Sequence, residues 1–88
     1  MQYEIHPDLD KTLAKLSKKD PKQFEILLKK IEEVIKSDPS HYKNLKRPLQ
    51  HYKRVHVKSS FVLLFRHEES KIIFRYYDHH DNIYDFKE

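Results

Sequence analysis

The sequence contains no cysteine and no glycine, and each absence excludes a class of site. Without cysteine the chain can form no disulfide and no thiolate metal site, which is typical of a protein in the reducing cytoplasm. Without glycine it cannot form the glycine-rich loop that binds nucleotide phosphates. Its turns are therefore expected to use proline, aspartate, asparagine, serine or histidine. No signal peptide and no apolar run of membrane-spanning length is recognisable, so a cytoplasmic protein is expected.

The positive charge of the chain is concentrated in its middle. The formal net charge is +4, and the whole excess lies in residues 41–58, which carry basic side chains and no acidic one. The residues before this segment are balanced in charge, and those after it are slightly acidic. A concentrated basic patch favours a polyanionic partner, either a nucleic acid or an acidic protein segment. A solvated basic loop is the simpler alternative.

The first half of the chain predicts a short strand followed by two helices. With 88 residues the chain can form one small domain, which we expect to span residues 1–88. Alternation over residues 2–5 indicates a strand with Tyr3 and Ile5 facing the core. Helical spacing of leucines indicates a helix over about residues 8–18, and Asp20-Pro21 is typical of the start of a second helix that ends near Ser37. The expected apolar face of this helical hairpin comprises Leu9, Leu13, Leu16, Phe24, Leu27, Leu28, Ile31, Val34 and Ile35.

The second half of the chain predicts three strands, over residues 52–58, 61–65 and 71–77. In the first of these, alternation places Val55 and Val57 toward the core and Arg54, His56 and Lys58 away from it. The second strand is apolar throughout, which indicates a central strand covered on both faces. The sequence therefore predicts an α+β fold of order β-α-α-β-β-β, in which the helical hairpin packs on an antiparallel C-terminal meander.

The last strand runs into Asp78-His79-His80-Asp81, a cluster of titratable side chains. Histidine can give or take a proton near neutral pH. If strand order and register allow, His56 and His80 flank a common point, with basic side chains of the 52–58 strand beside them. Cleavage of an RNA phosphodiester by its own 2′-hydroxyl requires such a set: a base, an acid and cations for the phosphoryl oxygens.

Simpler interpretations exist for these residues. A strand histidine that faces away from the core is often an ordinary surface residue. The histidine cluster lacks a third, well-spaced ligand, so no metal site is expected. The aromatic side chains Tyr76, Tyr77, Tyr84 and Phe86 could stack on bases, although Tyr76 and Phe86 are more simply explained by packing. Tyr52 fits either role.

Four segments of the chain resemble the RelE/ParE superfamily of toxins from toxin–antitoxin pairs. They are Leu45-Lys46-Arg47-Pro48-Leu49-Gln50, Tyr52-Lys53-Arg54-Val55-His56-Val57, Phe61-Val62-Leu63-Leu64-Phe65 and Asp78-His79-His80-Asp81-Asn82-Ile83-Tyr84. The resemblance covers essentially the whole chain. It implies a RelE-like fold and a metal-independent endoribonuclease without cofactor that cuts mRNA in the ribosomal A site. The implied partners are a cognate antitoxin protein, the ribosome and mRNA.

The resemblance also implies roles for individual residues. The implied catalytic residues are His56, His80, Arg54 and Tyr84. His56 and His80 match in type the histidines of the YafQ-like branch, whereas Tyr84 falls where the RelE branch has a functional tyrosine. The implied RNA- or phosphate-binding residues are Lys46, Arg47, Lys53, Lys58 and His79, and the resemblance implies no metal ligand.

The sequence departs from the family pattern at two positions. Val62 stands where the RelE branch has an arginine, and Ser60 stands near an acidic position of the YafQ-like branch. The first difference favours a two-histidine arrangement. Two other functions share this fold: a ParE-like, non-enzymatic inhibitor of DNA gyrase, and a degenerate member that only binds an antitoxin-like partner. The histidine pair favours cleavage over the gyrase inhibitor, and the degenerate member stays an alternative.

Overall fold

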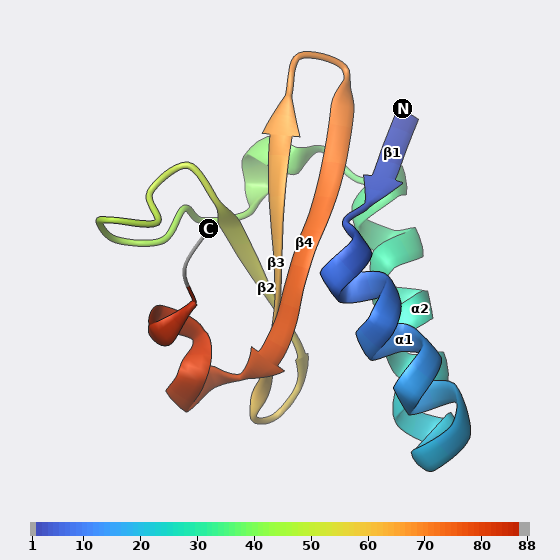
Figure 1. Ribbon diagram of the computed structural model, residues 1–88. Helices are drawn as coiled ribbons and strands as arrows, with labels where there is room; N and C mark the ends of the chain where they lie inside the picture. Colours follow the sequence, from blue (N-terminus) through green and yellow to red (C-terminus); the bar gives the residue numbers. More distant parts are fainter. Residues whose placement is uncertain (1, 87–88) are drawn as a thin grey trace.

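The fold is an α+β arrangement of a four-stranded sheet and two helices (Figure 1). The computed structural model describes residues 2–86, apart from the side chain of Tyr84. The elements are β1 (Gln2–Ile5), α1 (Pro7–Lys19), α2 (Pro21–Lys36), η1 (Pro39–His41), β2 (Lys53–Lys58), β3 (Phe61–Glu68), β4 (Lys71–His79) and η2 (His80–Asp85), where η1 and η2 are 3₁₀ helices. This confirms the predicted order of strands and helices.

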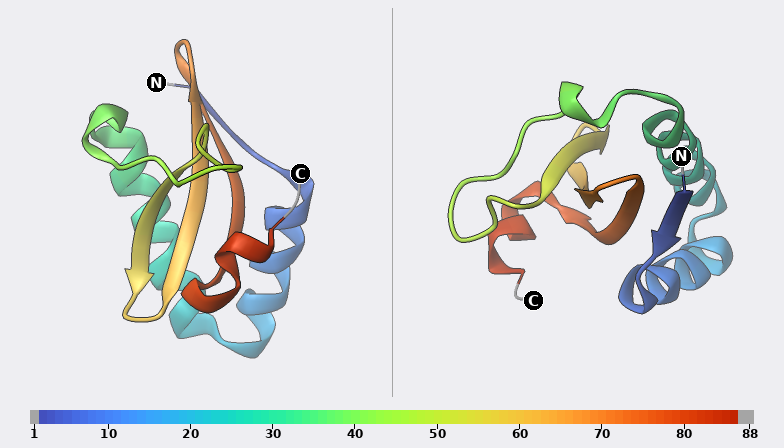
Figure 2. Two further views of the ribbon diagram at one scale, coloured as in Figure 1. Left: turned by 90° about the vertical axis from the view of Figure 1, so that its left-hand side faces the viewer. Right: turned by 90° about the horizontal axis from the view of Figure 1, so that it is seen from above.

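The sheet has the order β1-β4-β3-β2. The three C-terminal strands form the predicted antiparallel meander, and β1 adds to β4 in parallel. Figure 2 shows that both helices lie on one side of the sheet. Neither helix, nor any other within residues 2–86, has the length and apolar character needed to cross a membrane.

Both helices begin at a side-chain cap followed by proline. Asp20 accepts a hydrogen bond from the backbone N–H of Gln23, as predicted for the start of α2. In α1 the cap is His6, whose Nδ1 accepts the N–H of Asp8 at 3.1 Å, so this helix begins slightly earlier than predicted. Tyr77 of β4 donates its hydroxyl to the buried side chain of Gln23, which ties the start of α2 to the sheet.

The main core lies between the helices and the sheet. Its buried side chains are Leu9, Leu13, Leu27, Ile31, Val34, Leu63, Phe65, Ile72, Phe74 and Tyr77. Two residues predicted to face this core lie outside it. Leu28 is 39% exposed because the buried stripe of α2 is centred on Leu27 and Ile31, and the next residue is rotated by about 100°. Tyr3 is 51% exposed on the edge strand β1. Its ring makes one edge-on contact with the ring of Phe74 in the core.

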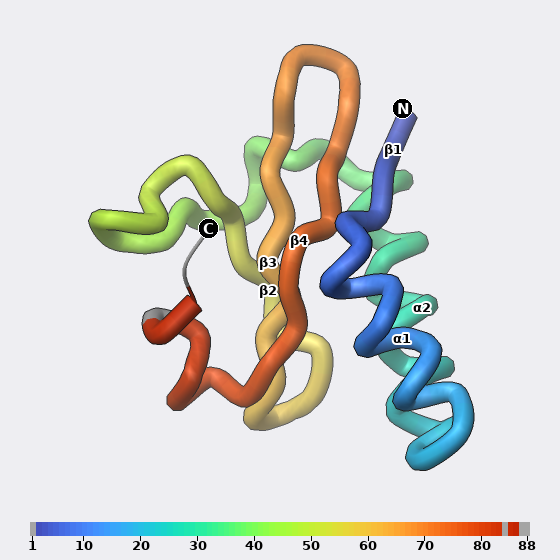
Figure 3. The backbone as a smooth tube through the Cα atoms, in the orientation of Figure 1, coloured from blue at the N-terminus to red at the C-terminus, as the bar shows by residue number. Residues whose placement is uncertain are grey.

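A second, smaller core covers the opposite face of β3. It comprises Leu45, Leu49, Tyr52, Val62, Leu64, Ile83 and Phe86. These side chains come from the segment between α2 and β2, from the sheet and from the C-terminal residues around η2. Figure 3 shows this segment and η2 on the side of the sheet away from the helices. The prediction that β3 is covered on both faces is therefore confirmed, and Tyr52 and Phe86 belong to the core.

A β-bulge in β2 corrects the predicted face of Lys58. His56 pairs with Val62, but the register then shifts and Lys58 pairs with Phe61. The ring of Phe61 stacks on Tyr77 in the helix-side core. Because paired residues share a face, Lys58 leaves the face on which Arg54 and His56 lie. Simple alternation along the strand cannot predict such an extra residue.

The turn between β3 and β4 departs from the expected residue types. Glu69 adopts a left-handed conformation there, with φ of 50°. This conformation costs an ordinary residue about 1–2 kcal/mol relative to the right-handed one. In a chain without glycine, a glutamate occupies the position that most proteins give to glycine, asparagine or aspartate.

Candidate functional site

Arg54 and His56 lie together on the exposed part of β2. Arg54 is paired with Leu64, and His56 is paired with Val62. Both of these partners belong to the small core beneath η2, so the two polar side chains border the face that η2 covers. Both are exposed to solvent. The structure thus places a guanidinium and an imidazole side by side at one edge of the sheet.

His80 lies where β4 ends and η2 begins. Its backbone N–H donates to the carbonyl of Ser60 at 2.8 Å, which fixes this point against the turn between β2 and β3. Three residues later, Ile83 is buried against the same face as Val62 and Leu64. The chain therefore turns from the end of the sheet onto the face that carries Arg54 and His56.

The register gives the approximate separation of the two candidate histidines. His56, Val62 and Asp78 form one row across β2, β3 and β4. Since adjacent strands lie about 4.8 Å apart, about 10 Å separate the backbone of His56 from that of Asp78. His80 follows Asp78 by two residues. The register therefore places the backbone of His56 two strands away from the end of β4, next to which His80 begins η2.

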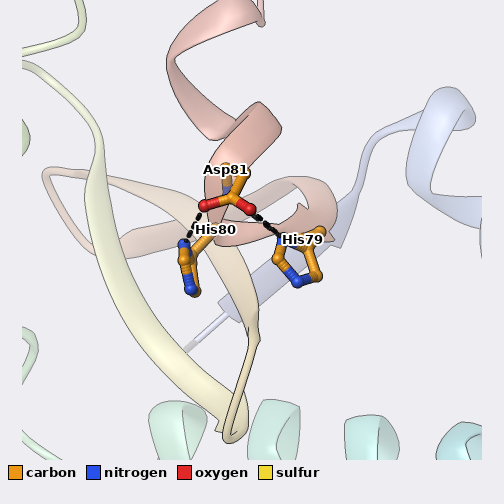
Figure 4. A group of neighbouring side chains, drawn as sticks. All are labelled: His79, His80 and Asp81. Atoms are coloured by element: carbon orange, nitrogen blue, oxygen red, sulfur yellow. Dashed lines mark hydrogen bonds and ion pairs between the residues drawn. The ribbon is translucent and has the colours of Figure 1, made fainter.

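The carboxylate of Asp81 lies between the imidazoles of His79 and His80 (Figure 4). Its Oδ1 is 2.8 Å from Nδ1 of His80, and its Oδ2 is 3.4 Å from Nδ1 of His79. The two rings extend to opposite sides of the carboxylate in Figure 4. Asp81 is largely exposed and His80 is half-exposed, so this group is accessible from solvent.

The two imidazoles make different contacts through Nδ1. Nδ1 of His79 accepts the backbone N–H of Asp81 at 3.2 Å, so this nitrogen carries no proton. Nδ1 of His80 lies 2.8 Å from Oδ1 of the Asp81 carboxylate, an ion-pair contact when the ring is protonated, so Nε2 is the ring nitrogen that this contact leaves for another group. A carboxylate in contact with one imidazole nitrogen can orient the ring. Sequence reasoning considered Asp81 only as a metal ligand and missed this role; the adjacent His-Asp pair was the available signal.

Asp78, by contrast, is engaged within the fold. Its Oδ2 accepts the hydroxyl of Tyr76 at 2.7 Å, and its Oδ1 accepts the backbone N–H of His79 at 2.7 Å. Burial, together with the Asp78 hydrogen bond, raises the pKa of Tyr76 to about 12. Asp78 therefore fixes the backbone just before the two histidines, and Tyr76 stays neutral at physiological pH.

The aromatic side chains near the site are used for packing. Tyr76 stacks on Phe86, with ring centroids 4.6 Å apart, and Tyr77 is buried in the helix-side core. These positions correct the idea that Tyr76, Tyr77 and Phe86 stack on bases. Tyr84 lies in η2, but its side chain is outside the described part of the structure.

The basic side chains are only partly gathered at the site. The Lys53 ammonium donates to the Tyr42 carbonyl at 3.1 Å and to the Asn44 side chain at 3.0 Å, so it holds the preceding segment. Lys58 lies toward α2, where it adds to the lowering of the Asp20 pKa that hydrogen bonds from Gln23 chiefly cause. Lys46 and Arg47 are exposed on the segment before β2. Among the predicted cations, Arg54 is the one placed beside His56.

No family model matches the sequence, but two curated proteins are similar to it over nearly its whole length. "Putative toxin RelE4" of Methanocaldococcus jannaschii is 53% identical over 85 residues, which cover 94% of this chain and 89% of that protein. An uncharacterized protein of Methanosarcina mazei is 48% identical over 83 residues, with coverage of 92% and 95%.

Solved structures with the same fold include bacterial toxins. YafQ from Escherichia coli BL21(DE3) superposes with a TM-score of 0.62 at 17% identity and covers 94% of this chain and 97% of its own. HP0894 from Helicobacter pylori superposes with a TM-score of 0.65 at 17% identity, with coverage of 92% and 96%. YafQ in the E. coli DinJ–YafQ toxin–antitoxin complex gives a TM-score of 0.60 at 18% identity, with coverage of 94% and 96%. At these identities the likeness concerns the fold.

Proposed function

Because this chain belongs to the RelE/ParE toxin superfamily, we propose that it is a toxin that cleaves mRNA in the ribosomal A site. The observation that carries the proposal is the Asp81–His80 pair, which sits at the end of β4 in a YafQ-like fold. A carboxylate-oriented imidazole with one free nitrogen is suited to proton transfer. A non-enzymatic inhibitor has no need of such a pair.

The proposed reaction is a transesterification within the RNA. One histidine, His56 or His80, takes the proton from a 2′-hydroxyl, and this oxygen attacks the adjacent phosphorus. The O2′–P bond forms while the P–O5′ bond breaks, and the other histidine gives a proton to the departing 5′ oxygen. The products are a 2′,3′-cyclic phosphate and a free 5′-hydroxyl. Each proton transfer by a positioned side chain contributes about 10²–10⁴-fold to the rate.

Arg54 is the proposed phosphate-binding residue of this reaction. It lies two residues before His56 on β2, on the same face of the strand, and its side chain is exposed. A guanidinium can donate two parallel hydrogen bonds to the phosphoryl oxygens, which carry extra negative charge in the transition state. Tyr84 is proposed to position the 2′-hydroxyl or to stack on a base. The chemistry requires no metal ion.

The proposed substrate is mRNA held by the ribosome rather than free RNA. The side chains of Arg54, His56 and His80 are exposed at the edge and end of the sheet. Exposed groups alone hold a flexible strand poorly in the in-line geometry that the reaction requires. The ribosome would supply this geometry, and exposed basic residues such as Lys46 and Arg47 would contact its RNA.

A cognate antitoxin is the proposed protein partner. Support comes from the E. coli DinJ–YafQ complexes, in which the chain with this fold is bound to its antitoxin. The acid-free segment 41–58 would attract an acidic antitoxin segment as well as RNA.

The proposal is tested with purified protein and programmed ribosomes, with primer extension to map the cuts. We expect cuts within the A-site codon, and far weaker cleavage of the same mRNA without ribosomes. The variants His56→Ala and His80→Ala should each lose cleavage, whereas His67→Ala, an exposed histidine elsewhere on β3, should retain it. Absence of cuts in all conditions, with inhibition of gyrase in a supercoiling assay, would instead identify a ParE-like inhibitor.

A further inference from the structure

Three potential metal ligands meet at the start of η2. His79, His80 and Asp81 each offer one ligand atom, and these atoms lie within 4.8 Å of one another. Two imidazole nitrogens and one carboxylate oxygen form a donor set that suits Zn²⁺ and neighbouring transition-metal ions. Spacing along the sequence argued against a metal site because it showed no separated third ligand. In the structure, three consecutive residues place their ligand atoms near one another, with the Asp81 carboxylate between the two rings.

The three ligand atoms lie within 4.8 Å of one another, somewhat farther apart than in a tetrahedral site. Zn²⁺ ligands at about 2.0–2.1 Å from the ion lie about 3.3 Å from one another. The distance from Asp81 Oδ2 to His79 Nδ1 is 3.4 Å, and that from Asp81 Oδ1 to His80 Nδ1 is 2.8 Å. Rotation of the side chains would be needed to bring one atom of each residue around a single ion. All three side chains are at least partly exposed, so water can complete the coordination.

The backbone of this site is already fixed. The N–H of His80 donates to Ser60, and the N–H of His79 donates to Asp78. The ring of His79 also packs edge-on against Phe61, with centroids 5.5 Å apart. Ligands held in this way lose less conformational freedom on binding an ion than ligands on a mobile loop.

Another histidine–carboxylate pair in the described chain is less suitable. Nδ1 of His6 lies 3.8 Å from the Asp8 carboxylate, but the guanidinium of Arg75 lies 3.3 Å from the same nitrogen. Arg75 also bonds to the Asp8 carboxylate at 3.1 Å. A cation already occupies this pair, and a second would be repelled. Within residues 2–86, the group at 79–81 is the one set of three such ligands.

We propose that His79, His80 and Asp81 bind a divalent transition-metal ion of the Zn²⁺ type, and that the ion switches off the catalytic histidine. Coordination through Nδ1 of His80 replaces its contact with Asp81 and requires that the proton of the neutral ring lie on Nε2. The Nε2 lone pair is then lost as a base. The ion also replaces the Asp81 backbone N–H as the partner of His79 Nδ1. The proposal of metal binding does not depend on the proposed function. The proposal that the ion inhibits cleavage rests on it.

Binding is tested on the full chain without RNA, by isothermal titration with ZnCl₂ and by the visible absorption of bound Co²⁺. We expect one saturable equivalent and a tetrahedral Co²⁺ spectrum. His79→Ala should weaken binding by at least about tenfold, whereas His67→Ala, the matched surface histidine, should not change it. Circular dichroism of each variant checks that the fold is retained. Equal binding by wild type and His79→Ala, or no saturable binding below about 1 mM, overturns the site.

Inhibition is tested by adding one equivalent of Zn²⁺ to the ribosomal cleavage reaction and then removing it with EDTA. Loss of cleavage that EDTA restores supports the switch. Unchanged cleavage at saturating Zn²⁺ overturns it. Metal binding without cleavage in any condition refutes the proposed function but leaves the metal site intact, so the two failures are distinguishable.

Discussion

The Oδ1 atom of Asp81 lies 2.8 Å from Nδ1 of His80, the residue that directly precedes it. The contact forms where the extended backbone of β4 turns into η2, and this turn is held by the bond from His80 N–H to Ser60. The orientation of the His80 ring thus depends on an adjacent carboxylate and on a fixed turn of the chain. The first prediction tests this relationship.

Asp81→Ala should reduce the rate of mRNA cleavage on the ribosome without preventing RNA binding. Loss of the carboxylate removes the contact at Nδ1 that orients the His80 ring, so the ring is free to rotate. We expect kcat to fall by at least about tenfold, a part of the 10²–10⁴-fold that a positioned acid or base contributes, with little change in KM. Asp85→Ala, an exposed acid at the other end of η2, is the matched control. An equal fall in both variants would assign the effect to net charge.

Arg54→Lys should lower cleavage although the positive charge is kept. Lysine cannot donate the two parallel hydrogen bonds of a guanidinium, so transition-state stabilisation decreases while general attraction to RNA persists. The expected loss in single-turnover rate is about tenfold, and Arg54→Ala should lose more. Full activity of the lysine variant would show that Arg54 acts only as a point charge.

Tyr77→Phe should destabilise the fold by about 1–2 kcal/mol, because the buried Gln23 carbonyl loses its hydroxyl donor. The same substitution at exposed Tyr3 should change the free energy of unfolding by less than about 0.5 kcal/mol. Urea denaturation of the two variants measures the difference. Equal stabilities would mean that the Tyr77–Gln23 bond does not tie α2 to the sheet.

The contribution of Tyr77 to the free energy of unfolding should be lost at alkaline pH. Burial, followed by the nearby Asp20 charge, raises the pKa of Tyr77 to about 12 from an ordinary value of 10.0. The neutral phenol is therefore favoured in the folded state, so this contribution is complete below about pH 10 and is lost between pH 10 and 12. Unfolding free energies of wild type and Tyr77→Phe should converge over that range. A constant difference from pH 8 to 12 would contradict the shift.

The sequence predicted the order of elements because each element carries its own signal. The alternation of Val55 and Val57 and the uninterrupted apolar run of β3 are local patterns, and both were confirmed. The parallel pairing of β1 with β4 was not predicted, because strand partners are chosen by tertiary packing. The bulge that removes Lys58 from the face of Arg54 and His56 was missed for the same reason, since alternation assumes one-to-one pairing.

The candidate site was only partly predictable. Residue type and family pattern pointed to His56 and His80, and their roles stay predictions. The adjacent His80-Asp81 pair was a sequence signal for their contact, but it did not establish the contact, because neighbouring side chains meet only in particular backbone conformations. The hydrogen bonds from Lys53 to Tyr42 and Asn44 could not be predicted either, because these partners are nine or more residues away in the sequence.

The most direct test of the account is primer-extension mapping of ribosome-bound mRNA after treatment with wild type, His80→Ala and His67→Ala. If His80 takes part in the chemistry, wild type and His67→Ala should both give A-site cuts. The cleavage rate of His80→Ala should be lower by about 10²-fold or more. Circular dichroism should show that all three proteins are equally folded. Undiminished A-site cleavage by a folded His80→Ala variant would contradict the account, because the Asp81–His80 pair would then have no part in the chemistry.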